Sequence, residues 1–396
     1  MVAMYSINKP PAHCASFCGP ARLPKAACLI LAACLMAVRH LNQLLAEQVE
    51  NEYTNNAVPE SRRLAPRRSR VGAHSAKQVA DFCVVTKVDS YTPSSWEAAW
   101  RRAAGHLGTS DNTVCAAMQK PTNVINAEAW IAHLAFCRQA DGNGTRRSVD
   151  CLSQADPAIF SRFHKSCATA GGRRVEWTEP IEPLVGHMRH PYANPQCLSE
   201  GVVGVRIEDR AYLMPLSDSP ERMAAHGYNG RKYLIDAGTN MHGTGLAWLV
   251  GAYERAGITF DEIFAWEASP VNATAYWADV PPGVAHALHF MNVPIQAEAG
   301  APMNPLTWVR SIYKPGDFVV FKLDIDNDAL ESALIAQIAD SVDLAGMIAE
   351  MFYEKHYREP AMQGYLGFDD QAAPYAEAVT MLGDLRARGL RIHYWP

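Results

Sequence analysis

After about residue 200, the chain alternates between short apolar runs and amphipathic helical stripes. Apolar runs typical of buried strands lie at 233–235, 263–266, 288–290, 318–326, 347–353 and 390–395. Between them, apolar residues recur at helical spacing, as in Leu246, Leu249, Val250 and Tyr253. This repeated alternation predicts a doubly wound α/β sheet over residues 201–396.

The preceding region, residues 80–200, has a different pattern. Apolar residues recur at helical spacing around Trp96 and again around Trp130, which predicts a mostly helical region. Over residues 202–214, apolar and polar residues alternate, and a charged turn interrupts the pattern. This predicts a β-hairpin that leads into the next domain.

All the cysteines beyond residue 80 fall in this helical region: Cys83, Cys115, Cys137, Cys151, Cys167 and Cys197. An even number confined to one region favours disulfides formed in an oxidising compartment, although the sequence does not choose the pairing. Zinc binding is a weaker alternative, because the chain has no C-x-x-C pair. Unpaired buried thiols are a third interpretation.

Residues 1–46 have the composition of an addressing segment. No acidic residue precedes Glu47, and Arg22 and Lys25 precede an apolar run that Arg39 closes. The run is shorter than the ~20 residues of a standard membrane span. This is typical of a signal peptide or signal-anchor. A short helix of the folded domain and an organelle transit peptide are the alternatives.

Other features of the chain agree with a secretory address. Residues 47–79 show no helical or strand period and predict a disordered stem. N-glycosylation triplets begin at Asn143 and Asn272. We therefore expect a protein of the Golgi or endoplasmic reticulum lumen, anchored through the N-terminal segment alone, or a secreted one.

Composition narrows the class of partner. The chain is 48% hydrophobic, which is typical of a globular protein and excludes wholesale disorder. Its formal net charge of −5 gives no reason to expect a nucleic-acid partner.

Candidate ligand-binding residues follow the first two strands of the predicted sheet. Asp236 and Gly238 come directly after the first strand, in a glycine-rich turn where a backbone without Cβ can approach a ligand closely. Glu267 ends the second strand, where a carboxylate can accept hydrogen bonds from both hydroxyls of a ribose. The alternative is that the glycines only form a tight turn and that Glu267 is a solvated strand end.

A second set of polar residues follows the next two strands. Asp324 and Asp326 are separated by one residue, and so are Glu354 and His356, so each pair shares a face on a regular strand. Adjacent parallel strands would bring the four groups to one rim. There they could act as a base or hold a divalent cation through oxygen ligands. A structural acid pair with a surface histidine is the equal alternative.

Four stretches resemble the FkbM-type S-adenosylmethionine-dependent methyltransferases: YLIDAGTNMHGTG, IFAWEASP, DFVVFKLDID and MIAEMFYEKH. The resemblance covers the C-terminal half and implies a Rossmann-like methyltransferase sheet. It assigns Asp236, Gly238 and Asn240 to the methionine part of S-adenosylmethionine and Glu267 to its ribose. The chain departs from the family at Asp326-Asn327, where a Glu-Gly pair is usual, and in a longer first loop.

The resemblance implies O-methylation of a hydroxylated acceptor, either a small molecule or a glycan. Two alternatives remain. Asp324-x-Asp326 also resembles the D-x-D of lumenal metal-dependent glycosyltransferases, although it follows an apolar strand rather than opening a loop. A catalytically silent binding protein that keeps the methyltransferase fold is the other, and the departure at Asp326-Asn327 favours it.

Overall fold

The computed structural model describes residues 83–107, 113–138, 154–169, 171–193, 205–216, 220–239, 245–358 and 373–396, all within one compact unit, Ala73–Pro396. The predicted addressing segment and stem lie outside the described residues. So do Asn143, Asn240, Cys151 and Cys197. Within these ranges, no helix combines the length and the apolar character that a membrane span requires.

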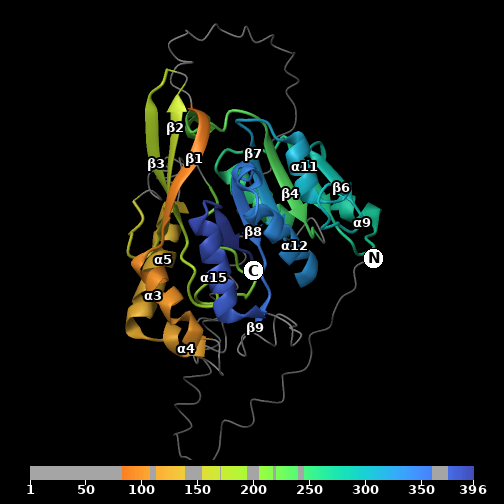
Figure 1. Ribbon diagram of the computed structural model, residues 1–396. Coiled ribbons are helices and arrows are strands. Elements are labelled where there is room, and N and C mark those ends of the chain that lie inside the picture. Colours follow the sequence, from red (N-terminus) through yellow and green to blue (C-terminus); the bar gives the residue numbers. More distant parts are fainter. Residues whose placement is uncertain are drawn as a thin grey trace, which may run out of the picture. The chain divides into compact units, whose positions relative to one another are not determined.

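A six-stranded sheet forms the centre of the C-terminal half (Figure 1), and every pair of neighbouring strands in it is parallel. Its spatial order is β11-β8-β7-β4-β5-β6. The strands are β4 (Lys232–Ala237), β5 (Glu262–Trp266), β6 (Leu288–Met291), β7 (Phe318–Leu323), β8 (Glu350–Tyr353) and β11 (Ile392–Tyr394). The predicted α/β sheet is therefore confirmed, and its order reverses between β4 and β7. In such sheets ligands bind at the carboxyl ends of the strands beside that reversal.

Helices connect these strands. They are α8 (Gly245–Arg255), α9 (Ala273–Ala278), α10 (Pro282–Ala285), α11 (Pro305–Ile312), α12 (Asp328–Ala339), α13 (Val342–Met347) and α15 (Tyr375–Ala387). The stripe predicted for the first of them is the buried face of α8. The strand predicted over 347–353 begins at Glu350 instead, because Met347 is the last residue of α13.

The first region contains a sheet that its sequence pattern did not predict. Strands β1 (Cys83–Thr92), β2 (Ser161–Thr169) and β3 (Arg174–Ile181) form an antiparallel sheet. Helices are present as predicted: α3 (Ser95–Ala103), η2 (Ala104–His106), α4 (Thr113–Met118) and α5 (Pro121–Arg138). The strands were missed because β2 buries polar residues such as Lys165 and Ser166, so the apolar alternation of a strand is absent from the sequence.

Disulfides are present in this region, as its cysteine content predicted. Cys83 in β1 is bonded to Cys167 in β2. Cys115 and Cys137 are disulfide-bonded as well. Covalent links of this kind are typical of proteins that fold in an oxidising compartment.

The predicted hairpin at 202–214 is wrong for the part that the structure describes. Residues 205–216 form turns and extended chain without a strand, and α7 (Pro220–Ala225) follows. Their backbone groups bond to buried carboxylates instead of a partner strand. Met214 N donates to Glu182 Oε2 at 2.9 Å, and Leu216 N donates to Glu350 Oε1 at 2.9 Å. A short parallel pair, β9 (Tyr357–Arg358) and β10 (Ala373–Pro374), completes the described strands.

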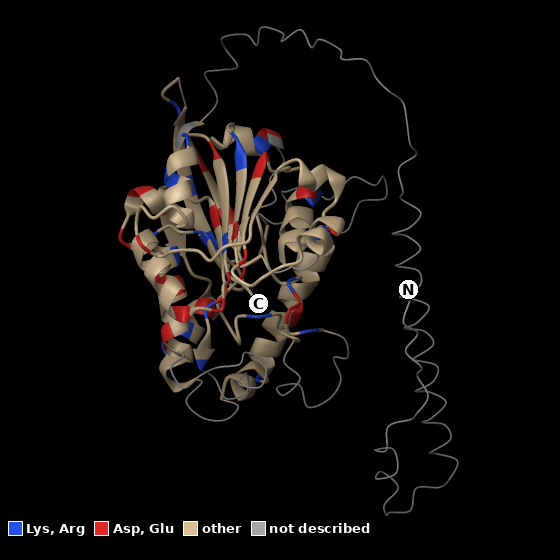
Figure 2. Cartoon of the chain, turned by 90° about the vertical axis from the view of Figure 1, so that its right-hand side faces the viewer, with Lys and Arg blue, Asp and Glu red and all other residues tan. Residues whose placement is uncertain are grey.

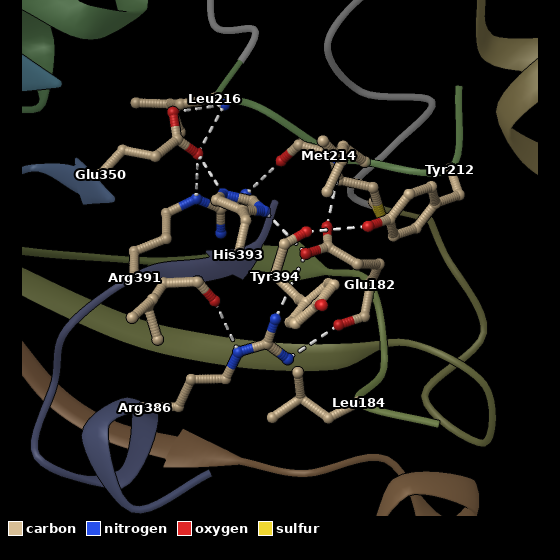
Figure 3. Close-up of polar contacts among 12 residues, drawn as sticks. Glu182, Leu184, Tyr212, Met214, Leu216, Glu350, Arg386, Arg391, His393 and Tyr394 are labelled. Atoms are coloured by element: carbon tan, nitrogen blue, oxygen red, sulfur yellow. Dashed lines mark hydrogen bonds and ion pairs between the residues drawn. The ribbon is translucent and has the colours of Figure 1, made fainter. Parts of the chain in front are cut away.

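A buried polar network joins the first region to the edge of the six-stranded sheet (Figure 3). Glu182, just after β3, lies 3.2 Å from Arg386 Nη2 of α15 and 2.7 Å from His393 Nδ1 of β11. Glu350 of β8 lies 2.7 Å from His393 Nε2 and 2.8 Å from Arg391 Nε. Helix α15 also contacts β1 and α3 (Figure 1). The two parts of the chain therefore pack as one interior.

Candidate functional site

The backbones of β4 and β7 come together just beyond their last residues, at the reversal of strand order. Gly238 has φ +93°, and a Cβ there would lie 1.5 Å from the carbonyl oxygen of Asp324. Glycine is therefore required at this position by the neighbouring chain. This is a structural reason for glycine at position 238, and it leaves the predicted role of Gly238 in ligand binding untested.

Lys322 organises this point of the sheet. Its Nζ lies 3.1 Å from Asp236 Oδ1 and 3.1 Å from Asp324 Oδ2, and it donates to the Gly238 carbonyl at 2.7 Å. Burial opposes the charged form of this lysine, but the two carboxylates outweigh burial and raise the pKa of Lys322. A charged lysine therefore sits between the ends of β4 and β7.

Asp236 is fully buried and incompletely paired. Its Oδ2 has no hydrogen-bond partner, although both oxygens are shielded from solvent. The hydroxyls of Thr239 and Tyr276 are also buried close by, facing each other without the geometry of a full hydrogen bond. Burial, with the negative charges of Asp236 and Glu267 nearby, raises the pKa of Tyr276 to about 12. Buried polar atoms without partners are rare in native proteins, and a missing ligand is one explanation.

Glu267 lies at the end of β5, as predicted, one strand away from Asp236. It is partly exposed, and its Oε1 accepts a hydrogen bond from Ser269 N at 2.6 Å. Its carbonyl oxygen accepts one from Asn292 Nδ2 at 2.8 Å. The predicted glycosylation residue Asn272 is exposed and caps α9 by accepting from Ala275 N at 3.0 Å. Asn272 is thus at the outer start of that helix.

The four predicted acid–base residues come together beyond β7 and β8. His356 Nε2 lies 3.6 Å from Asp326 Oδ1 and 3.8 Å from Glu354 Oε2. The carboxyl groups of Glu354 and Asp324 lie close enough for each to shift the pKa of the other. The predicted gathering is confirmed.

The prediction that each pair shares a face of a regular strand was wrong, although the two strands do end at the same edge. β7 ends at Leu323 and β8 ends at Tyr353, so neither pair lies on a regular strand. Asp326 has φ +54°, a left-handed value uncommon outside glycine. The side chain of Asp326 is 83% exposed, whereas Glu354 and His356 are mostly buried.

Local charges distribute protons unevenly in this cluster. Burial raises the pKa of Asp324, but Lys322 and hydrogen bonds from Glu354 and Trp395 outweigh it and leave that pKa lowered. Burial and the charge of Asp324 raise the pKa of Glu354. The carboxylate of Glu354 beside it raises the pKa of His356 to about 9. Asp324 and Glu354 therefore form a carboxyl pair that can hold one proton between them, as a general acid–base does.

A cation could be held by Asp326, Glu354 and His356, whose ligand atoms lie within 4.8 Å of one another. The raised pKa of His356 works against this, because a metal ligand must be deprotonated. A metal on Asp324 is disfavoured more strongly, since Lys322 Nζ and Trp395 Nε1 both lie 3.1 Å from its Oδ2. The geometry favours an ion-paired cluster.

Sequence reasoning missed three residues that complete the site. Arg189 Nη2 lies 3.3 Å from Glu354 Oε1, and the guanidinium of Arg210 lies 4.2 Å from the ring centroid of Trp395. Both arginines come from described stretches without helix or strand, 182–193 and 205–216, whose sequence has no local pattern that points to β8. Lys322 carried a signal, because a lysine inside an apolar strand must find a buried partner. In Figure 2 acidic and basic residues are interspersed, and both lie at the ends of the central strands.

Comparison with known proteins adds no relative: no protein-family model, curated protein or solved structure matches this chain. The fold is an α/β sheet of Rossmann-like strand order, and the site lies where such sheets bind ligands.

Proposed function

We propose that this protein is an S-adenosylmethionine-dependent methyltransferase of the FkbM type that methylates an oxygen of its acceptor. The observation that carries the proposal is Asp236. It is the last residue but one of β4, at the reversal of strand order, and its buried Oδ2 has no hydrogen-bond partner. The ammonium of the methionine part of S-adenosylmethionine would supply the missing donor.

A second acid supports the same ligand. Glu267 directly follows the adjacent strand β5, which is where a carboxylate can accept hydrogen bonds from ribose hydroxyls. The resemblance of the sequence around both acids to the FkbM-type family agrees with this placement. Asn240 belongs to the same proposal and lies outside the described residues.

The acid cluster supplies the remaining chemistry. Methyl transfer to a hydroxyl requires the acceptor to be held in line with the sulfonium and its proton to be removed. The carboxyl pair of Asp324 and Glu354 is proposed as the base, with His356 beside it as a positive charge. The acceptor is a hydroxylated small molecule or a glycan, and the disulfides agree with work in the secretory pathway.

The metal-dependent glycosyltransferase alternative has less support. It requires Asp324 and Asp326 to bind a metal ion together, but Lys322 and Trp395 occupy Asp324. The silent binding protein differs from an enzyme only in activity. The departure from the family at Asp326-Asn327, which favoured this alternative, has a structural explanation. Asn327 caps α12 by accepting a hydrogen bond from Leu330 N at 3.1 Å.

Calorimetric titration of the full chain with S-adenosylmethionine tests the proposal. We expect micromolar binding that Glu267→Ala abolishes. Glu262→Ala is the matched control, since Glu262 begins the same strand at its opposite end and should leave binding unchanged. A parallel titration uses a nucleotide sugar with manganese, with Asp324→Ala as its variant.

The results separate the three functions. No S-adenosylmethionine binding by a folded chain would refute the methyltransferase proposal. Nucleotide-sugar binding that Asp324→Ala removes would favour a glycosyltransferase. S-adenosylmethionine binding without methyl transfer to any hydroxylated acceptor in a screen would favour a silent binding protein.

A further inference from the structure

The chain between β5 and α9 carries an N-glycosylation triplet at the surface. Asn272, Ala273 and Thr274 form this triplet, and all three residues are exposed. Asn272 directly precedes α9, so the triplet begins in a loop and ends in the first turn of the helix. A glycan is bulky, and an asparagine that accepts one must lie at the surface. Asn272 meets this requirement, and the middle position holds alanine rather than the proline that the signal excludes.

The two ends of the Asn272 amide have different tasks. Its Oδ1 accepts a hydrogen bond from Ala275 N at 3.0 Å and so caps α9. Its Nδ2 donates no hydrogen bond to any residue that the structure describes. An N-linked glycan is attached through this nitrogen and leaves the carbonyl oxygen unchanged as an acceptor. The modification is therefore compatible with the helix cap.

The loop before Asn272 is held in place by Asn292, which directly follows β6. The Nδ2 of Asn292 donates to the carbonyl oxygens of Glu267 at 2.8 Å and of Ser269 at 2.7 Å. Its Oδ1 accepts a hydrogen bond from Val271 N at 3.0 Å. None of these bonds involves the side chain of Asn272. A glycan on Asn272 therefore leaves intact the contacts that hold the backbone of Glu267.

The disulfides point to the compartment in which N-glycans are attached. Cys83 is bonded to Cys167, and Cys115 and Cys137 are disulfide-bonded as well. Disulfides are rare in the cytosol and form in oxidising compartments such as the lumen of the endoplasmic reticulum. The transfer of N-glycans takes place in the same lumen. The disulfides are thus a second observation, independent of the triplet, that favours modification of Asn272.

We propose that Asn272 carries an N-linked glycan. In the transfer step, Nδ2 of Asn272 forms a bond to the anomeric carbon of an oligosaccharide that is held on a lipid diphosphate. The bond between that carbon and the diphosphate oxygen breaks, the lipid diphosphate leaves, and the amide releases one proton. The proposal is independent of methyl transfer, because attachment of the glycan requires neither S-adenosylmethionine nor a methyl acceptor.

The test is mass spectrometry of the full chain purified from eukaryotic cells, before and after treatment with a peptide N-glycosidase. This enzyme removes an N-linked glycan and converts the asparagine that carried it to aspartate. We expect the treatment to lower the mass of the chain and to convert Asn272. Peptide mapping locates the conversion and separates it from any at the Asn143 triplet.

Thr274→Val should abolish the modification, because it removes the hydroxyl of the triplet while Asn272 still caps α9. Thr274→Ser is the matched control, since it keeps the hydroxyl and should keep the glycan. Thr274 is exposed, so both variants should melt close to the wild type. The proposal is overturned if Asn272 is unmodified in the wild-type chain, including a chain that never enters the secretory pathway. It is also overturned if Thr274→Val retains the glycan or if Thr274→Ser loses it.

Discussion

His393 Nε2 lies 2.7 Å from Glu350 Oε1, and Nδ1 of the same ring lies 2.7 Å from Glu182 Oε1 (Figure 3). Both ring nitrogens therefore face a buried carboxylate. Further buried charges surround the ring. Among the described residues of this network, the permanent cations Lys165, Arg386 and Arg391 face the carboxylates Glu97, Glu179, Glu182 and Glu350.

Removing this ring should destabilise the protein strongly. His393→Leu leaves two buried carboxylates short of a partner, and breaking a buried pair costs about 3–5 kcal/mol. The free energy of unfolding, measured by denaturant titration, checks this. His289→Leu is the control: His289 is 52% exposed on β6, so its loss should change stability by about 0.5 kcal/mol or less. Equal effects of the two variants would contradict the inferred role of His393.

Stability should fall in acid through Glu350. Burial raises its pKa, but the hydrogen bond from His393 and the charge of Arg391 outweigh burial and lower the pKa to about 2 from 4.5. Because the folded-state pKa is depressed, the contribution is present above pH 4.5 and is lost as the pH falls towards 2. It amounts to about 3 kcal/mol.

Denaturant titrations between about pH 5 and pH 2 measure this loss. Glu350→Gln should be less stable at neutral pH and should show a shallower acid dependence. Glu176→Gln, at an exposed position of β3, should follow the wild-type curve. A wild-type acid dependence in the Glu350→Gln variant would refute the assignment to Glu350.

The imidazole of His356 should titrate far above the ordinary range of histidine. Its folded-state pKa is raised to about 9 from 6.5, chiefly by the neighbouring carboxylate of Glu354. The stabilisation is therefore complete below pH 6.5 and is lost as the pH rises through about 9. An NMR titration of the imidazole measures this pKa directly. Glu354→Gln should return it towards 6.5, whereas Glu298→Gln at an exposed position should leave it unchanged.

Gly238→Ala should be more damaging than an equivalent change elsewhere. Both Gly238 and Gly300 have positive φ, +93° and +83°, where an alanine is strained by about 1–3 kcal/mol. At Gly300 a Cβ meets no atom within 4 Å, but at Gly238 it would collide with the Asp324 carbonyl oxygen. Thermal unfolding of the two variants separates strain from collision. Similar melting temperatures would show that β4 and β7 do not approach as closely as described.

The sequence predicted the C-terminal half well because its signals are local. Apolar runs and helical stripes repeat within a few residues of one another, and they place Asp236 and Glu267 at the ends of adjacent strands. The gathering of Asp324 and Glu354 followed from the same reasoning, since parallel neighbouring strands end at one edge.

What only the tertiary structure decided is which charges meet across distant parts of the chain. Arg189 reaches Glu354, and Glu182 reaches His393, from segments that have no hydrophobic period. β2 was hidden for the same reason, because it buries Lys165 against Glu179. Hydrophobic periodicity records which face of an element is buried. A buried charge is stabilised by a partner far away in the sequence, so it leaves no local pattern and is found only when the chain is folded.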